Sequence, residues 1–399
     1  MKIDTDSKKI DDILTRGVEE IIEKESFVRK LKSGKQMRIK FGIDPTGPVI
    51  HLGNAVPFRK LREFQGLGHR IILIIGDFTA RIGDPSDKES MRQPLTKIEI
   101  KKNMKTYKTQ IGKILDLKKT EFAYNGKWLS KLNFQEILGK LANQFTVAQI
   151  LERENFMARY KTGKPIGLPE FLYPLMQGYD SMIVKADLEI GGTDQKFNML
   201  AGRNIQRAYN QRPQDIMTLT LLSGTDGRKM SKSYGNIIGI NDKPNDMYGK
   251  IMSIKDELIP QYFELCTLLP LMEAREFRDG LKNKKINPRD AKAKLAYEIV
   301  KIYHGEKSAA AAEKEFVKVF KEKEMPAEMP EIKLPEKETN ILELLVKTKL
   351  TSSKSEAKRL IEQGGVKING EIQNDWRKIV FAQKGMIIQS GKRKFVKII

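Results

Sequence analysis

The sequence predicts an α/β protein built on a parallel sheet, followed by a helical domain and a small α+β domain at the C-terminus. Three observations predict this class. A strand–helix–strand pattern spans residues 37–78, a helical pattern covers 243–321, and a Pro-, Glu- and Lys-rich segment precedes the last part of the chain. At 399 residues, the chain has room for two or three domains of ordinary size.

The strand–helix–strand unit begins at residues 37–44 (MRIKFGID), where apolar side chains alternate with Lys40, Gly42 and Asp44. The turn-rich segment 45–53 follows, and residues 54–63 then read as a helix. Residues 70–78 (RIILIIGDF) form a continuous apolar run, as in strands buried within a parallel sheet. Because such sheets bind ligands at the carboxyl ends of their strands, the peptides after these strands are candidates for a binding site.

The remaining elements follow in order. A helical stretch is expected from about Lys97 to Tyr160, and a second half of a nucleotide-binding fold from about Leu188 to Arg203. The pattern from Lys243 to Lys321 is helical, and the segment from Lys321 to Asn340 has the composition of a linker. The expected domains are therefore a Rossmann-like catalytic domain over 1–225, a helical domain over 226–325, a linker over 326–340 and a C-terminal domain over 341–399.

The C-terminal domain is short and basic. Ser353 and Glu356 predict a capping box that opens a helix ending near Gly364, with short strands around 366–372 and 385–399. Residues 341–399 hold 13 Lys and Arg against 5 Asp and Glu. A solvated surface would explain this charge, but its concentration in a separate module after a linker favours RNA binding.

Composition narrows the class of protein further. The chain carries 73 Lys and Arg against 51 Asp and Glu, a net charge of +22, which suits a polyanionic partner but is also found in generally basic proteomes. Cys266 is the only cysteine, which excludes an internal disulfide and a Cys-based zinc site, and three histidines argue against a multi-histidine metal site. The charged N-terminus and the short apolar runs indicate a cytoplasmic enzyme that is not in a membrane.

Two peptides have the chemistry of phosphate sites. His51-Leu52-Gly53-Asn54 lies at a strand-to-helix turn, where Gly53 allows close approach and free backbone N–H groups favour an anion. A histidine in a turn is, taken alone, more often a surface or capping residue. Lys229-Met230-Ser231-Lys232-Ser233 follows a polar, flexible loop, and its two lysines could close over a triphosphate. An exposed Lys/Ser-rich loop is the simpler alternative.

Together and in this order, the two peptides resemble the signature motifs of class I aminoacyl-tRNA synthetases. Three further segments resemble the tyrosine-specific branch of that family: Gly83–Ser86, Phe171–Asp180 and Gly191–Gln195. Residues 341–399 resemble an S4-like RNA-binding domain, so the resemblance covers nearly the whole chain. It implies a helical anticodon-binding domain over 226–325, ATP and Mg²⁺, L-tyrosine and tRNA(Tyr) as partners, and a homodimer joined near 132–160.

The resemblance also implies a role for each matching residue on the ATP side. Thr46 and His51 would contact the phosphates in the transition state. Asn54, Gly192 and Asp194 would face the ribose, with Gly53 at the turn. The residues that would serve the pyrophosphate are Lys88, Arg92, Lys229, Lys232 and Ser233. A carboxylate at Asp194 suits a ribose diol on physical grounds as well.

On the amino-acid side, the resemblance implies that Asp180 receives the phenol of tyrosine. The residues that would surround the charged backbone end of the substrate are Asp84, Tyr173, Gln177 and Gln195. An ammonium needs a carboxylate, so Asp84 is apt. The alternatives are a helix cap for Asp84 and core packing for Tyr173.

The sequence departs from the family pattern at two positions. Asn54 replaces a more usual histidine, although either side chain donates a hydrogen bond. Lys40 stands where many tyrosine enzymes place a tyrosine that meets the substrate phenol. Three outcomes remain open for Lys40 in the amino-acid pocket: contact with the phenol, pairing with Asp180, or exposure to solvent.

Two rival functions are compatible with parts of this pattern. The tryptophan-specific enzymes share both signature motifs, but Asp180 and the S4-like tail favour tyrosine, since an indole does not need a carboxylate as a phenol does. A non-catalytic RNA-binding protein could keep the same fold, and the intact His51, Lys229 and Lys232 argue against it.

Overall fold

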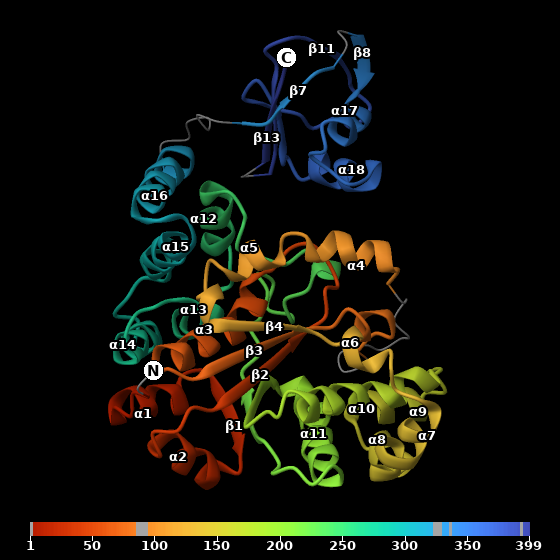
Figure 1. The fold of residues 1–399 in the computed structure, drawn as a ribbon. Helices are drawn as coiled ribbons and strands as arrows, with labels where there is room; N and C mark the ends of the chain where they lie inside the picture. Colours follow the sequence, from red (N-terminus) through yellow and green to blue (C-terminus); the bar gives the residue numbers. More distant parts are fainter. Residues whose placement is uncertain (1–2, 85–94, 322–328, 335–336, 392–393) are drawn as a thin grey trace. The chain divides into compact units, whose positions relative to one another are not determined.

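The first of two compact units, Met1–Ala309, is built on a six-stranded sheet. The computed structural model (Figure 1) describes residues 3–84, 95–321, 329–334, 337–391 and 394–399, and its second unit is Ala310–Ile399. The sheet has the strand order β1-β6-β5-β2-β3-β4. Its strands are β1 (Val18–Ile22), β2 (Arg38–Ile43), β3 (Arg70–Ile75), β4 (Thr120–Tyr124), β5 (Leu188–Gly192) and β6 (Asp215–Leu219).

The sheet topology fixes where a ligand site can form. Only the pairing of β1 with β6 is antiparallel; the other neighbours in this sheet are parallel. The chain runs outward from β2 to β3 and β4, then returns to β5 and β6 on the other side of β2. A crevice therefore opens at the carboxyl ends of β2 and β5, where the direction of winding reverses.

The predicted strands at 37–44 and 70–78 are confirmed. All residues of β3 after Arg70 are buried, as the continuous apolar run predicted. The predicted second half-fold near 188–203 is also confirmed, as β5 followed by α11. Helix α10 packs along α11, and Figure 1 shows the two side by side in yellow and green.

The helices described for the first unit lie before β1, in the connections between the strands, and in the region after β6. Up to α11 they are α1 (Ser7–Thr15), α2 (Lys24–Lys32), α3 (Leu52–Gly66), α4 (Lys97–Met104), α5 (Tyr107–Ile111), α6 (Gly126–Leu129), α7 (Phe134–Glu136), α8 (Val147–Leu151), α9 (Glu154–Lys161), α10 (Leu168–Ile183) and α11 (Lys196–Ala208). A π-helical turn at Ile137–Leu141 follows α7.

The prediction of one helical stretch from Lys97 to Tyr160 was wrong at β4. Residues Thr120–Tyr124 form an edge strand that pairs in parallel with β3. Four of its five side chains are only partly buried, because an edge strand has a neighbouring strand on one side only. The strand is short and follows a Lys-rich turn, so its own periodicity is too weak to distinguish it from the helices around it.

The predicted helical region after Lys243 is confirmed. Its helices are α12 (Pro244–Met252), α13 (Ile259–Cys266), α14 (Leu271–Lys282), α15 (Pro288–His304) and α16 (Glu306–Lys321). Phe263 of α13 stacks on Phe277 of α14 with ring centroids 4.1 Å apart. Cys266 ends α13 in this core, and burial raises the pKa of its thiol to about 12.

In its described residues, the second unit contains two small sheets and two helices after α16. One sheet has the order β10-β9-β12-β13-β7, and β11 pairs with β8. The elements are β7 (Glu331–Ile332), β8 (Lys337–Asn340), α17 (Ile341–Lys347), α18 (Lys354–Glu362), β9 (Val366–Ile368), β10 (Glu371–Ile372), β11 (Ile379–Ala382), β12 (Ile387–Ser390) and β13 (Lys394–Ile398). Their apolar side chains form one core that includes Ile341, Leu345 and Ile388.

Two predictions for this unit need correction. The linker proposed over 326–340 is wrong for β7 and β8, because β7 pairs with β13 and β8 pairs with β11. The predicted helix at Ser353 is confirmed, with the Ser353 hydroxyl accepting from the backbone N–H of Glu356. The Glu356 carboxylate, however, accepts from Ser352 and not from the cap residue.

Within the part of the chain that the structure describes, none of the helices has the length and apolar character needed to span a bilayer.

Candidate active site

A cavity of about 360 Å³ opens at the carboxyl ends of the parallel strands. It brings together the described site residues that the sequence predicted: Lys40, Thr46, His51, Gly53, Asn54, Asp84, Tyr173, Gln177, Asp180, Gly192, Asp194, Gln195, Lys229 and Lys232. Lys88 and Arg92 lie outside the described residues. The backbone of Ser233 belongs to a short 3₁₀ turn, Lys232–Tyr234, and its side chain lies outside the described part.

His51 is the N-cap of α3. Its Nδ1 accepts from the backbone N–H of Asn54 at 3.4 Å, and the Asn54 side-chain oxygen accepts from the backbone N–H of His51 at 3.3 Å. Burial, followed by the charges of Lys232 and Lys229, lowers the pKa of His51 to about 4. The imidazole is therefore neutral at pH 7, with its proton on Nε2, and it can donate one hydrogen bond into the cavity. The capping alternative is therefore confirmed for His51, which also lines the cavity.

The loop peptide 229–233 lies against this helix start. The backbone N–H of Gly53 donates to the sulfur of Met230 at 3.4 Å, and Met230 is buried. A Cβ on Gly53 would lie 3.1 Å from Nδ1 of His51, so the turn has little room for a side chain. A Cβ on Gly47 would lie 2.5 Å from Nζ of Lys232, which puts this ammonium beside the turn after β2.

The other lysine of the loop, Lys229, has a carboxylate partner. Nζ of Lys229 lies 2.8 Å from Oδ2 of Asp194, in the 3₁₀ turn after β5, and both side chains are partly exposed. Lys229 and Lys232 therefore provide positive charge on the side of the cavity that faces the N-terminus of α3. The expectation of free N–H groups at this turn was wrong, because the first N–H groups of the helix donate to Ile238, Met230 and His51.

On the opposite side, amide side chains form a continuous chain of hydrogen bonds. Nε2 of Gln195 donates to Asp84 at 2.7 Å, and Nδ2 of Asn198 donates to the carbonyl oxygens of Gln195 and Gln177, each at 3.1 Å. Nε2 of Gln177 donates in turn to Glu189 at 3.1 Å. This side of the cavity thus combines carboxylates with oriented amides, a donor set suited to an ammonium and a carboxylate on one small molecule.

Tyr173 is held by Asp44 at the end of β2. Its hydroxyl donates to Oδ2 of Asp44 at 2.9 Å, and the hydroxyl of Thr79 donates to Oδ1 at 2.7 Å. Burial, followed by the negative charge of Asp44, raises the pKa of Tyr173 well above its ordinary value. A Cβ on Gly76 would collide with Asp44 and Thr79, so this arrangement requires a glycine there.

Asp180 lies on the buried side of α10 and is 4% exposed. The indole N–H of Trp128 donates to Oδ1 at 2.6 Å, and Nδ2 of Asn125 donates to Oδ2 at 3.2 Å. Burial raises the pKa of Asp180 to about 7, although Lys40 and these two donors work in the opposite direction. Each carboxylate oxygen can accept a second hydrogen bond, so Asp180 is available to a hydroxyl in the cavity.

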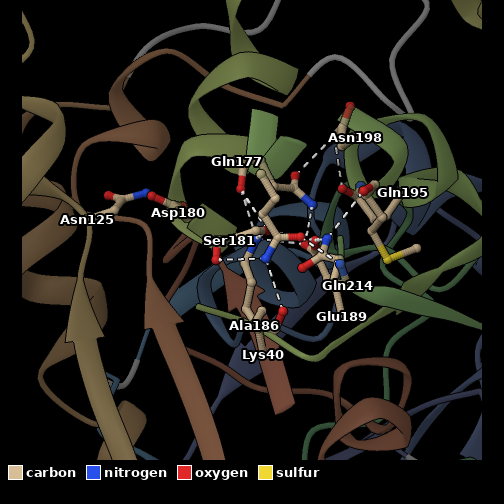
Figure 2. A network of polar contacts seen from close by, with 12 residues as sticks. Lys40, Asn125, Gln177, Asp180, Ser181, Ala186, Glu189, Gln195, Asn198 and Gln214 are labelled. Carbon is tan, nitrogen blue, oxygen red and sulfur yellow. Dashed lines mark hydrogen bonds and ion pairs between the residues drawn. The ribbon is translucent and has the colours of Figure 1, made fainter. Parts of the chain in front are cut away.

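For Lys40, the structure gives an outcome that the sequence reasoning did not include. Its side chain is fully buried, and its Nζ lies 2.8 Å from Glu189, from the Ser181 hydroxyl and from the backbone carbonyl of Gln177 (Figure 2). All three ammonium protons are thereby used. Solvent exposure and direct pairing with Asp180 were therefore wrong, because the partner is Glu189 on the neighbouring strand.

Several site residues were missed by sequence reasoning. Glu189 lies within the segment assigned to the second half-fold, and Asn125 and Trp128 lie in a stretch interpreted as helical. Asn198 was likewise within the segment assigned to the second half-fold. The position of Asn125 immediately after β4 would have marked it as a strand-end residue, had that strand been recognised.

Comparison with known proteins agrees with this geometry. Residues 32–321 match the family model described as tRNA synthetases class I (W and Y), and 321–398 match that of the tyrosine–tRNA ligase SYY-like C-terminal domain. The tyrosine–tRNA ligase of Thermotoga maritima is 51% identical, over 97% of this chain and 96% of its own length. That of Moorella thermoacetica is 50% identical, over 97% of this chain and 94% of its own.

Solved structures show the same fold at lower sequence identity. Tyrosyl-tRNA synthetase from Archaeoglobus fulgidus, complexed with L-tyrosine, aligns with a TM-score of 0.63 and 22% identity, over 78% of this chain and 100% of that one. A C-terminally truncated mitochondrial tyrosyl-tRNA synthetase from Aspergillus nidulans aligns with a TM-score of 0.64 and 22% identity, over 78% and 94%. The two family models and the near-full-length relatives lead to one conclusion: the chain belongs to the tyrosyl-tRNA synthetase family of class I aminoacyl-tRNA synthetases.

Proposed function

We propose that this protein attaches L-tyrosine to tRNA(Tyr) in two ATP-dependent steps. In the first, the tyrosine carboxylate attacks the α-phosphate of ATP, forming tyrosyl-adenylate and releasing pyrophosphate. In the second, a terminal hydroxyl of the tRNA attacks the activated carbonyl and releases AMP. One observation carries this proposal. The same cavity has Asp180 and the amide chain on one side and His51, Lys229 and Lys232 on the other.

We assign tyrosine recognition to the buried side. The phenol hydroxyl donates to Asp180, which Trp128 and Asn125 hold in place. The α-ammonium is accepted by Asp84, with the Gln177 carbonyl oxygen beside it. The other residues that we assign to the amino-acid subsite are Tyr173, Gln195 and Lys40.

We assign the nucleotide to the side formed by the helix start and the loop. The neutral His51 donates from Nε2 to a phosphate oxygen, and Thr46 at the turn after β2 donates its hydroxyl. Asp194 binds the ribose diol near Asn54 and Gly192, which frees Lys229 from its ion pair to meet the phosphates. Lys229, Lys232 and Ser233 then stabilise the charge that develops on the leaving pyrophosphate, and no covalent enzyme intermediate is needed.

The same proposal covers the remaining partners. ATP enters as its Mg²⁺ complex, in which the metal is carried by the phosphates. The helical region 226–325 binds the anticodon part of the tRNA, and the basic C-terminal unit adds RNA contacts. Exposed apolar side chains around 132–160 support a homodimer joined there; they are Phe134, Leu138, Val147 and Tyr160. The buried single cysteine suits the cytoplasm.

ATP–pyrophosphate exchange with each standard amino acid in turn tests the proposal. Tyrosine alone should support exchange at high rate. A preference for tryptophan would assign the chain to the other branch of the family, and an absence of exchange with all amino acids would leave a non-catalytic RNA-binding role.

A further inference from the structure

Lys40, placed in the amino-acid subsite above, forms a buried ion pair with Glu189, and both residues line the cavity. The two residues are register neighbours on β2 and β5, so their side chains leave the sheet on the same face. Their side chains are 0% and 1% exposed, and Nζ lies 2.8 Å from Oε1. Glu189 also accepts from Ser181 and Gln214, so both of its oxygens are engaged.

The pair is one end of the amide chain drawn in Figure 2. From Glu189 the chain runs through Gln177, Asn198 and Gln195, and its other end is Asp84. An ionised carboxylate only accepts hydrogen bonds. Each end must therefore receive an amide N–H, which turns the carbonyl oxygens of Gln177 and Gln195 toward the middle of the chain. The orientation of both amides follows from the two carboxylates.

We propose that Lys40 and Glu189 act as a positioning pair for the amino-acid substrate, by fixing Gln177 with its carbonyl oxygen toward the site of the substrate ammonium. The inference rests on the proposed function of the cavity. Lys40 reaches Gln177 twice, once through Glu189 and once through the backbone carbonyl at 2.8 Å. Neither charged group needs to touch the substrate.

Lys40 is required because Glu189 must stay ionised. A buried carboxylate without a counter-charge takes up a proton in preference to remaining charged. A protonated Glu189 can donate as well as accept, so it no longer dictates which end of the Gln177 amide it receives. With the amide reversed, an N–H would face the substrate ammonium, and binding of the amino acid would weaken.

The first test is Lys40→Met, measured by ATP–pyrophosphate exchange in the full-length protein. The KM for tyrosine should rise about tenfold, as for loss of one hydrogen bond to a charged group, while the KM for ATP stays within about twofold of wild type. The matched control is Lys30→Met, which removes a second Lys–carboxylate pair of 2.8 Å, between the 13% exposed Lys30 and the buried Asp215, outside the cavity. This variant should lower the Tm without changing the KM for tyrosine.

Two further variants separate positioning from stability. The double variant Lys40→Met/Glu189→Gln removes both charges and leaves an amide that, like a protonated Glu189, can donate as well as accept, so its KM for tyrosine should stay about tenfold above wild type and rise no further than in Lys40→Met. In a Gln177→Leu background, adding Lys40→Met should change the KM for tyrosine by less than twofold, because the group through which the pair acts is gone.

The outcomes distinguish this inference from the proposed function. Wild-type exchange without tyrosine specificity overturns the function itself. Tyrosine-specific exchange together with equal changes in both KM values for Lys40→Met, or an unchanged effect of Lys40→Met in the Gln177→Leu background, overturns the positioning role alone.

Discussion

The two sides of the cavity are built differently. On the amino-acid side, Asp180 and Glu189 are buried and hydrogen-bonded to fixed partners from strands and helices. On the nucleotide side, Lys229 and Asp194 pair with each other while partly exposed, and the lysine belongs to a loop. Under the proposed function, the amino-acid side is thus formed before substrate arrives, whereas the nucleotide side would exchange internal contacts for contacts with ATP.

Substrate recognition and catalysis thus depend on different sides of the cavity. A preformed, dry site discriminates between ligands because an unsuitable ligand leaves buried polar groups unpaired. A loop whose charges rearrange is suited to contacts that strengthen only as the pyrophosphate leaves. Substitutions on the two sides should therefore affect different kinetic constants.

The largest effect is expected on the nucleotide side. Lys232→Ala should slow adenylate formation by a factor on the order of 10²–10³, as for loss of one donor that acts in the transition state, with little change in Tm. Pre-steady-state measurement of the first step checks this, with the exposed Lys255→Ala as the control. An unchanged first-step rate would remove Lys232 from the mechanism.

The next largest effect is expected on the amino-acid side. There a substitution should lower the discrimination between tyrosine and phenylalanine as well as the rate. Asp180→Ala should lower kcat/KM for tyrosine about 10²-fold, because a hydrogen bond to a buried charged group is lost, while kcat/KM for phenylalanine changes little. Comparing the two substrates in both proteins measures the compression of the ratio. If the ratio survives, another residue reads the phenol hydroxyl.

Removing the C-terminal unit should leave both sides of the cavity intact. Because β7 and β8 pair within that unit, the chain should be stopped after Lys321 and not within the segment predicted as a linker. Tyrosine activation should persist, while the KM for tRNA in charging rises about tenfold at physiological salt through loss of phosphate contacts. Loss of both activities together would show that the unit supports the catalytic fold.

The smallest expected effect is a pH dependence of the amino-acid side. Asp180 has a pKa raised to about 7, so its acid form dominates below that pH. Between pH 7.5 and 6.5, its ionised fraction falls about threefold, and the apparent KM for tyrosine should rise by about the same factor. The KM for phenylalanine should stay flat. Trp128→Phe removes a donor that favours the ionised form, so it should move the tyrosine profile to higher pH.

Much of this molecule could be predicted from local sequence. The continuous apolar run at 70–78 and the alternating one at 37–44 identify the central strands, and the strand-to-helix turn identifies His51 and Gly53, whereas Asp194 is expected from the family resemblance. The amphipathic pattern after Lys243 likewise predicts the helices found there. These features depend on periodicity and on turn chemistry, both of which are visible within a dozen residues.

What could not be predicted depends on distant partners. Lys40 is followed in sequence by ordinary strand residues, and its partner Glu189 lies 149 positions away on a strand that becomes its neighbour only in the folded sheet. Asn125 and Trp128 reach Asp180 from the residue after the edge strand β4 and from the four-residue helix α6, and both elements are too short to show periodicity of their own. Pairing of β7 with β13 converts part of an apparent linker into a sheet.

The single cysteine offers a way to follow motion in the helical region. Alkylating reagents attack the thiolate, and Cys266 is buried at the end of α13 with its pKa raised to about 12. In the closed helical core this thiol should be almost inert. Its rate of modification in the native protein therefore reports how often α13 opens, as amide exchange does for a backbone N–H. Measured with and without tRNA, the same rate would show whether RNA binding holds these helices closed.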